Sequence, residues 1–231
     1  MDSDDEEELG GQYDYLFDED TESDTQSADE HLRRLTHLLA HTPLPPPTSP
    51  LPSPIPGFRL YRAYLPAALL TSYEAWLTAQ YFPTTATNQA MHFGALPSDT
   101  PLGYLSQLCQ RLRSNPQALD QAIINCYRTG EGIGDHVDLR RFADSVCGVS
   151  FGAPATMRLA PVVDERQHVY AQERAESERD VYVRIMPGDV YVLEGEARWR
   201  WTHGFPRRVR GRVNVKGCRV SVTLRTVVPD E

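Results

Sequence analysis

The chain has 231 residues and a formal net charge of −9, which is enough length for one sizeable domain with additional segments. The charge is uneven: residues 1–57 contain 14 acidic and two basic residues, whereas the rest contain 18 acidic and 21 basic residues, a net of +3. No signal peptide and no apolar run of membrane-spanning length is visible. The four cysteines show neither C-x-x-C pairing nor zinc-ligand spacing. We therefore expect a soluble, intracellular protein with reduced thiols and no membrane partner.

The N-terminal part divides into an acidic tail, residues 1–42, and a proline-rich linker, residues 43–57. Residues 1–30 contain too few apolar side chains to offset the entropy cost of ordering them. The sequence HLRRLTHLLAH at 31–41 has the spacing of a short amphipathic helix. The linker contains eight prolines, a composition typical of an extended, semi-rigid spacer. We predict a mostly disordered acidic tail with at most a short helix over 31–41.

The folded domain is predicted over residues 58–231, and helices are expected in its first half. Residues 60–64 predict a short strand. Pro66 suits the first turn of a helix, and apolar residues recur after it at helical spacing. A strand over Gln89–Phe93 and a second helix over Leu102–Leu112 follow. The helices therefore precede most of the strands.

The second half of the chain has the pattern of an all-β unit. Its strand candidates are short, rich in β-branched and aromatic residues, and separated by glycine, proline or charged turns. The seven candidates are Ala122–Arg128, Ser145–Gly152, Thr156–Ala160, Val181–Met186, Val190–Leu193, Arg198–Trp201 and Val220–Val227. The charged loop from Val162 to Asp180 is expected to be exposed. The order of elements predicts an α+β, mainly β fold: a double-stranded β-helix, or jelly roll, flanked by N-terminal helices.

His136, Asp138 and His203 are the candidate metal ligands. His136-Val137-Asp138 is an H-x-D step, and on extended backbone residues two apart point to the same side. His203 can supply a third ligand if the fold brings its strand alongside. Two histidines and one carboxylate form the facial triad of non-haem Fe(II) oxygenases, which leaves positions open for a co-substrate and oxygen.

Two arginines near the C-terminus are candidate anion ligands. Arg219 and Arg225 are six residues apart on one predicted strand, so both should point inward together. An inward-facing charge is costly unless it is paired. The dicarboxylate 2-oxoglutarate has about the right length to meet both arginines, with hydrogen bonds from Asn125 and Tyr127. A pair of internal salt bridges is the structural alternative.

These motifs occur in a fixed order along the chain: N-x-Y, G-x-G-x-G, H-x-D, G-D-V-Y-V-L-E-G, W-x-H-G and R-x5-R. Together they resemble the AlkB family of Fe(II)/2-oxoglutarate dioxygenases, over roughly residues 58–227. The resemblance implies that His136, Asp138 and His203 bind Fe(II). It also implies that Arg219 and Tyr127 hold the distal carboxylate of 2-oxoglutarate.

The same resemblance implies further roles. Arg225 and Asn125 would lie near the other carboxylate of 2-oxoglutarate. With O₂, the co-substrate becomes succinate and CO₂ while the substrate is hydroxylated; an N-methyl group then leaves as formaldehyde. The strand from Asn88 to Gly94 resembles the lid-side strand of the family, so Met91 and Phe93 are candidate substrate contacts.

Arg140 complicates the choice of substrate. In AlkB-type repair enzymes an acidic residue at this place, two beyond the metal-binding aspartate, contacts the alkylated base. A cationic side chain there would repel a cationic base and favour a phosphate, a carboxylate or an anionic modification, if it points into the pocket. The alternative is that Arg140 belongs to a basic rim. We therefore treat Arg140 as a substrate-binding candidate.

Three hypotheses about function remain open. The first is oxidation or demethylation of modified nucleic acid, DNA, RNA or tRNA, supported by the basic cluster of residues 207–216. The second is a protein side-chain oxygenase, for example on histones, since the acidic tail suits a basic protein partner. The third is a non-catalytic interaction module, against which the complete triad argues. We expect a monomer in the nucleus, the cytoplasm or both.

Overall fold

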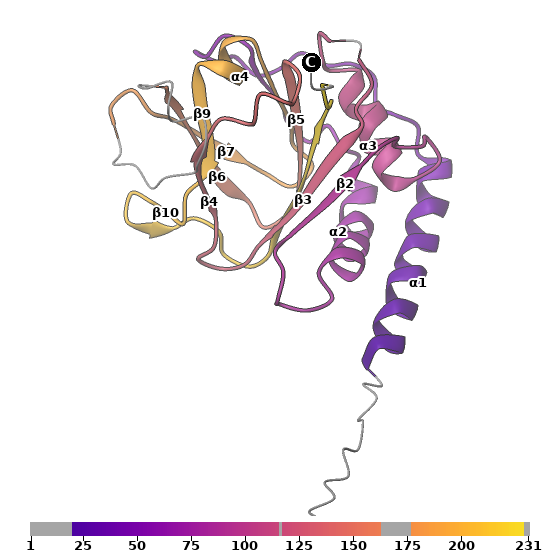
Figure 1. Ribbon diagram of the computed structural model, residues 1–231. Helices are drawn as coiled ribbons and strands as arrows, with labels where there is room; N and C mark the ends of the chain where they lie inside the picture. The colour runs from indigo at the N-terminus through magenta and orange to yellow at the C-terminus, as the bar shows by residue number, and fades with distance from the viewer. Residues whose placement is uncertain (1–19, 116, 163–176, 229–231) are drawn as a thin grey trace, which may run out of the picture.

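Two antiparallel sheets form the centre of the molecule (Figure 1). The computed structural model describes residues 20–115, 117–162 and 177–228, with the backbone alone for residues 20–26. The larger sheet has the strand order β1-β8-β5-β12-β3-β2, and the smaller has the order β4-β9-β6-β7. A separate hairpin pairs β10 with β11.

The strands of the larger sheet are β1 (Phe58–Tyr61), β2 (Gln89–Phe93), β3 (Gln121–Tyr127), β5 (Ser145–Gly152), β8 (Val190–Glu194) and β12 (Arg219–Arg225). Those of the smaller sheet are β4 (Ile133–His136), β6 (Ala155–Pro161), β7 (Val181–Ile185) and β9 (Trp201–Phe205). The hairpin strands are β10 (Arg208–Val209) and β11 (Arg212–Val213), and the helices are α1 (Asp20–His41), α2 (Ala67–Tyr81), α3 (Pro101–Gln110) and α4 (Glu196–Trp199).

From β3 onward the chain passes repeatedly from one sheet to the other. β3, β5, β8 and β12 lie in the larger sheet, while β4, β6, β7 and β9 lie in the smaller one. Eight strands shared in this way between two facing sheets make a jelly roll. The predicted fold class, mainly β with flanking helices, is confirmed.

β12 shows how the sequence separates the two faces of the larger sheet. Val220, Val222 and Leu224 are fully buried in an apolar cluster that includes residues of α2 and α3. The intervening Arg219 and Arg225 are also buried but take the other side, because neighbouring side chains of a strand alternate. The inside of the jelly roll therefore contains charge, and its outer face is covered by helices.

The two predicted helices of the domain are confirmed as α2 and α3. Pro66 immediately precedes α2, as expected from its fixed φ and missing N–H. The hydroxyl of Thr100 caps α3 by accepting a hydrogen bond of 3.0 Å from the Gly103 N–H, a common N-cap arrangement. Both helices pack against the larger sheet and so hold its outer face closed (Figure 1).

The prediction of disorder fails for residues 20–30, because α1 begins at Asp20 rather than near residue 31. Ala28 and Leu35 are buried, and Leu35 has no exposed surface. Packing of this apolar stripe on α2 stabilises a helix that its polar composition disfavours. The rest of the predicted disorder, residues 1–19, lies outside the described residues.

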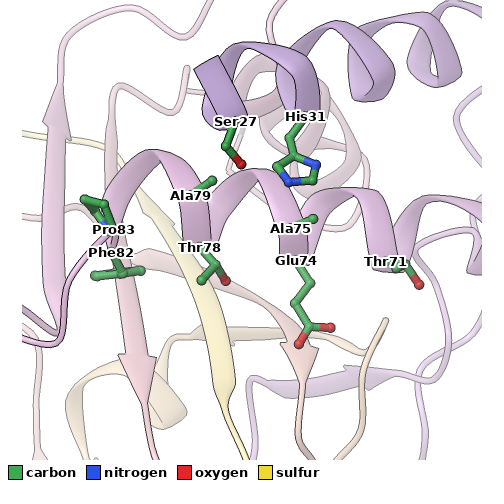
Figure 2. A pocket seen from close by; sticks show the side chains of 9 residues that line it. All are labelled: Ser27, His31, Thr71, Glu74, Ala75, Thr78, Ala79, Phe82 and Pro83. Atoms are coloured by element: carbon green, nitrogen blue, oxygen red, sulfur yellow. The ribbon is translucent and has the colours of Figure 1, made fainter. Parts of the chain in front are cut away.

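An open hollow of about 580 Å³ lies between α1 and α2 (Figure 2). Ser27 and His31 of α1 border it on one side, and small and polar residues of α2 border it on the other. Glu74, on α2, points away from α1 toward the strands (Figure 2). None of the predicted site residues lines this hollow.

The proline-rich segment 43–57 runs without helix and lies against the domain. Tyr104 and Arg111 donate hydrogen bonds of 3.5 and 3.1 Å to the carbonyls of Pro43 and Pro45. Ile55 is 1% exposed. The segment therefore packs against the folded domain in addition to linking it to α1.

Two further differences concern the second half of the chain. The predicted strand Arg198–Trp201 is wrong: residues 196–199 form the short helix α4, and the strand is β9, which starts at Trp201. The strands β4, β10 and β11 were not predicted, since glycine and charged residues dominate them. Most of the predicted exposed loop, residues 163–176, lies outside the described residues. In the described part of the chain, no helix is long and apolar enough to cross a membrane.

Candidate active site

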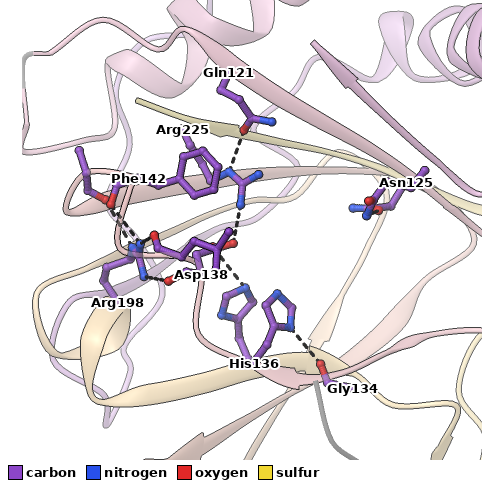
Figure 3. Close-up of polar contacts among 12 residues, drawn as sticks. Gln121, Asn125, Gly134, His136, Asp138, Phe142, Arg198 and Arg225 are labelled. Carbon is purple, nitrogen blue, oxygen red and sulfur yellow. Dashed lines mark hydrogen bonds and ion pairs between the residues drawn. The ribbon is translucent and has the colours of Figure 1, made fainter. Parts of the chain in front are cut away.

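His136, Asp138 and His203 come together inside the jelly roll. His136 ends β4 and pairs across the ladder with His203 of β9, while Asp138 follows β4 by two residues. One ligand atom from each lies within 4.8 Å of the others, and the two rings are 4.4 Å apart between centroids. The Nδ1–H of His136 donates to the Gly134 carbonyl at 2.9 Å (Figure 3). This bond directs the other ring nitrogen, Nε2, to the metal position.

Close contact between β4 and β9 depends on Gly204, next to His203. A Cβ atom at Gly204 would lie 2.8 Å from Asp135 Oδ1 and 2.9 Å from the backbone of Gly134. Such distances are too short for carbon contacts. The absence of a side chain at Gly204 therefore allows the two histidine-bearing strands to approach each other.

The charges around Asp138 and His203 suit a divalent cation. Burial alone would raise the pKa of Asp138, but His203 and the Arg225 guanidinium lower it to about 2. Burial, with the neighbouring His136, lowers the pKa of His203 to about 3. At neutral pH the site therefore presents an ionised carboxylate and a neutral imidazole, the forms that bind metal. Asp138 Oδ2 is buried and has no hydrogen-bond partner, which leaves it available as a ligand.

Arg219 is a buried cation with unused donors. It has no exposed surface, and its Nη1 donates to Ser221 Oγ at 3.1 Å. Its Nε and Nη2 have no partner, and no carboxylate pairs with it among the described residues. The guanidinium lies 3.8 Å from the ring centroid of Phe205 and 5.8 Å from that of Tyr127. A buried cation with free donors fits the carboxylate of a ligand.

Arg225 forms an internal salt bridge, which is the alternative that the sequence left open. Its Nη1 lies 2.5 Å from Asp138 Oδ1, and its Nε donates to Gln121 Oε1 at 2.8 Å (Figure 3). Of the two arginines, only Arg219 keeps donors free for an external anion, and its contact with 2-oxoglutarate stays a prediction. Arg225 fixes the carboxylate of Asp138, a candidate metal ligand, in position. Its contact with 2-oxoglutarate stays a prediction.

Asn125 and Tyr127, on β3, line the same small cavity as the three candidate metal ligands. Asn125 is 9% exposed, and its Oδ1 accepts a hydrogen bond of 2.8 Å from Gln89 Nε2. Burial raises the pKa of Tyr127, so its hydroxyl stays protonated and can donate. Gln89 and Tyr191, which also line the cavity, were not predicted. Side chains of a strand alternate between its two faces, and this period along β2 and β8 is the signal that could have found them.

Arg198 was missed because its segment was expected to be a strand. It is 2% exposed, and its guanidinium donates hydrogen bonds to four backbone carbonyls of the loop that follows the H-x-D step (Figure 3). The acceptors are Asp138 at 3.0 Å, Leu139 at 2.9 Å, Phe142 at 3.2 Å and Ala143 at 3.4 Å. Arg198 therefore holds the backbone that carries Asp138, the acidic candidate metal ligand.

The three candidate substrate residues lie at the surface and do not line the cavity. Arg140 is exposed, which agrees with a rim position. Met91 and Phe93 are 52% and 56% exposed. They share a face of β2 with Gln89, which does line the cavity. Met91 and Phe93 therefore stay candidate substrate contacts.

The residues of the site fit two groups, a divalent iron ion and 2-oxoglutarate. His136, Asp138 and His203 would hold Fe(II), and Arg219 would hold the distal carboxylate of 2-oxoglutarate. Together, the bound iron and 2-oxoglutarate supply the oxidising chemistry with O₂. The chain's own part is to orient these groups, keep the ligands in their metal-binding protonation states and exclude bulk water.

Comparison with known proteins defines the class. A family profile described as the 2OG-Fe(II) oxygenase superfamily matches residues 66–225. The chain belongs to the 2OG-Fe(II) oxygenase superfamily, whose members use Fe(II), 2-oxoglutarate and O₂. Its fold and triad are those of a 2-oxoglutarate-dependent iron dioxygenase.

Within this superfamily the chain is similar to AlkB-type proteins. It is 26% identical over 166 residues to the alkylated DNA repair protein ALKBH8 homolog of Arabidopsis thaliana, covering 63% of this chain and 46% of that protein. It is 28% identical over 144 residues to the uncharacterized protein L905 of Acanthamoeba polyphaga mimivirus, covering 59% of this chain and 62% of that protein. The solved structure of OsALKBH1 shares the fold, with a TM-score of 0.53 and 14% identity over 76% of this chain and 100% of that chain. The chain thus spans less than two thirds of either curated relative.

Proposed function

We propose that this protein is an AlkB-like Fe(II)/2-oxoglutarate-dependent dioxygenase that oxidises or demethylates a modified base of DNA, RNA or tRNA, with release of succinate and CO₂. Two observations support the oxygenase chemistry: the buried triad, and the Arg219 guanidinium, which has unused donors and lies against Phe205 of the same cavity. The similarity to a relative named as an alkylated DNA repair protein homolog supports the substrate class.

The basic hairpin β10–β11 provides the observation that favours nucleic acid. Five cationic residues occur between positions 207 and 216, with no acidic residue among them: Arg207, Arg208, Arg210, Arg212 and Lys216. A hollow of about 330 Å³ beside the hairpin is lined by Arg184, Arg212 and Lys216, and by no acidic residue. Phosphate groups of a nucleic acid backbone match this surface.

The hairpin is anchored to the domain. The Asn214 side chain accepts a hydrogen bond of 2.7 Å from the Thr156 N–H and donates to the carbonyls of Thr156 and Pro206 at 2.8 and 2.9 Å. Val215, next to it, is fully buried. An anchored set of cations loses less entropy on binding phosphate than a flexible loop does.

The exposed position of Arg140 bears on the kind of base. Because Arg140 does not line the cavity, it does not place a positive charge against a base bound there. At the rim it would meet a phosphate beside the modified nucleotide. The proposal therefore includes cationic modified bases as well as neutral ones.

The test is an oxygenase screen with the full chain, Fe(II) and 2-oxoglutarate against methylated oligonucleotides, tRNA and methylated histone peptides. Succinate and the mass of the oxidised substrate are measured together, with Asp138→Ala as the inactive control. A product on the nucleic acid arm supports the proposal. A product on the histone arm alone would replace it with the second candidate, a protein side-chain oxygenase, for which the 14 acidic residues of positions 1–57 offer charge complementary to a basic partner.

Phosphate contact at the hairpin is tested separately by salt dependence of binding to a single-stranded oligonucleotide. The slope of log K against log [salt] is negative, and each single-strand phosphate contact contributes about 0.7 to its magnitude. The double variant Arg212→Gln/Lys216→Gln should therefore reduce that magnitude by about 1.4. The double variant Arg33→Gln/Arg34→Gln removes the same charge from exposed positions of α1 and should leave the slope unchanged. Equal slopes in all three proteins would contradict the role of the hairpin. Residence in the nucleus or the cytoplasm, and a monomeric state, stay predictions.

A further inference from the structure

The four cysteines form two contacting pairs that differ in exposure. Cys109 and Cys147 have no exposed surface and contact each other in the cluster beneath α3. Cys126 of β3 is 1% exposed, but its partner Cys218, immediately before β12, is partly exposed. The Sγ atoms of Cys126 and Cys218 are 3.2 Å apart. Only the second pair therefore combines sulfur contact with access from solvent.

We propose that Cys126 and Cys218 are an oxidation-sensitive thiol pair, a modification site at which a peroxide closes a disulfide between β3 and the start of β12. Because Val220 pairs with Cys126 in the ladder, Cys218 lies diagonally across from Cys126. Bond closure brings the sulfurs from 3.2 Å to about 2.05 Å. This movement of about one ångström is shared between the two side chains and the backbone that carries them.

The environment of Cys218 suits the attacking sulfur. The hydrogen bond from Cys126 lowers the pKa of Cys218 to about 7, although burial opposes the ionisation. The same pairing, with burial, raises the pKa of Cys126. Cys218 is also the sulfur that solvent reaches, whereas Cys126 is 1% exposed. We therefore assign Cys218 as the nucleophile and Cys126 as the resolving thiol, since the thiolate is the reactive form.

The oxidation is balanced in two steps. The Cys218 thiolate attacks one oxygen of hydrogen peroxide, the O–O bond breaks, and, with one proton taken up, Cys218 sulfenic acid and water form. The Cys126 sulfur then attacks Cys218 Sγ, the S–O bond breaks, and the Cys126 proton leaves with the hydroxyl as a second water. Two electrons pass from the two sulfurs to the peroxide.

The pair lies on the strands that carry the 2-oxoglutarate contacts. Cys218 precedes Arg219, Cys126 precedes Tyr127, and Arg219 pairs with Tyr127 in the ladder. Space at this end is tight: a Cβ at Gly152, the other ladder partner of Arg219, would lie 2.4 Å from the Cys218 carbonyl oxygen. A binding site tolerates displacements of only about 0.5 Å. Closure of the disulfide should therefore raise the 2-oxoglutarate concentration that half-saturates the protein.

The test treats the full chain with hydrogen peroxide in the presence of a chelator, which prevents iron-driven oxidation. We expect the intact mass to fall by two hydrogen atoms, and a non-reducing tryptic map to link the peptide containing Cys126 to the peptide Gly217–Arg219. Cys109 and Cys147 in the same sample should remain alkylatable after denaturation. Dithiothreitol should reverse the change.

Two single variants distinguish the roles of the sulfurs. Cys218→Ser should give no linked peptide. Cys126→Ser should leave the Cys218 sulfenic acid unresolved and reactive toward dimedone. A link that involves Cys109 or Cys147, or oxidation of Cys218 to its sulfinic acid without any link, would overturn the proposed site.

The effect on 2-oxoglutarate binding is measured separately. The melting temperature of the linked protein is followed over a range of 2-oxoglutarate concentrations, with Mn²⁺ in place of iron, and the concentration that gives half of the maximal increase is determined. An increase of several-fold over the reduced protein, absent in Cys218→Ser, is expected. An unchanged value in fully linked protein would overturn the coupling between this thiol pair and Arg219.

Discussion

Replacing Arg219 with methionine should have opposite effects on the free protein and on co-substrate binding. In the free protein Arg219 is a fully buried cation whose Nε and Nη2 lack partners. Methionine has a similar length and suits the neighbouring rings of Phe205 and Tyr127. The substitution therefore removes a desolvation cost from the free protein and a ligand contact from the bound one.

The magnitudes can be worked from the two environments. An unsatisfied buried polar group costs about 1–3 kcal/mol, so Arg219→Met should raise the free energy of unfolding by up to that amount. The melting temperature rises by about 2–4 °C for each kcal/mol in a domain of this size. Removing one partner of a buried charge pair costs about 2–5 kcal/mol. This loss weakens 2-oxoglutarate binding by about 30-fold to about 4,000-fold, at tenfold for each 1.4 kcal/mol.

The assay is thermal unfolding of wild type and variant, with Mn²⁺, over a range of 2-oxoglutarate concentrations. Wild type should be stabilised progressively, because a ligand that binds only the folded state shifts the equilibrium. Arg219→Met should start higher and respond only at far greater concentrations. Arg225→Met is the matched control: it leaves the Asp138 carboxylate unpaired and should destabilise the free protein by about 3–5 kcal/mol. If Arg219→Met were less stable than wild type when both are measured without ligand, the view that this guanidinium lacks a partner until an anion binds would be refuted.

Four further outcomes are expected. Asp138→Ala should abolish Fe(II) binding measured by isothermal titration, with the far-UV circular dichroism unchanged; retained tight binding would remove Asp138 from the ligand set. Arg198→Ala should weaken metal binding at least tenfold, since the loop bearing Asp138 loses four hydrogen bonds, and Arg198→Lys should recover only part of it; equal affinities in the two variants would contradict the role of the planar guanidinium. Gly204→Ala should lower both the melting temperature and the metal affinity, because the new Cβ would lie 2.8 Å from Asp135 Oδ1; an unchanged affinity would show that the β4–β9 contact does not set the histidine geometry. In metal-free protein, the free energy of unfolding should fall as the pH decreases from about 6.5 to about 3, because His203 takes up its proton at a higher pH in the unfolded chain than in the folded one. His203→Leu should flatten the dependence of this free energy on pH in that range. An identical dependence in wild type and variant would argue against the lowered pKa.

The parts of the fold that follow from local pattern were predicted from the sequence. Alternating apolar and polar residues along β12 placed Val220 and Val222 on one face and both arginines on the other, since the period of a strand is two. Helices α2 and α3 followed from apolar spacing and from Pro66. The short β4 and the helix α4 were missed, because in segments of about four residues glycine and charge give no usable period.

The sequence by itself determined the chemistry of the site: the H-x-D step, the later histidine and the two arginines, in an order that resembles AlkB. Residue types and spacings are local properties, so they are readable without a fold. Only the tertiary structure decided which charges are paired. It joined Arg225 to Asp138, left Arg219 without an acidic partner among the described residues, attached Arg198 to the metal-ligand loop and brought Cys126 against Cys218. These contacts join residues up to 92 positions apart, and such contacts depend on how the two sheets close on each other, which no local pattern encodes.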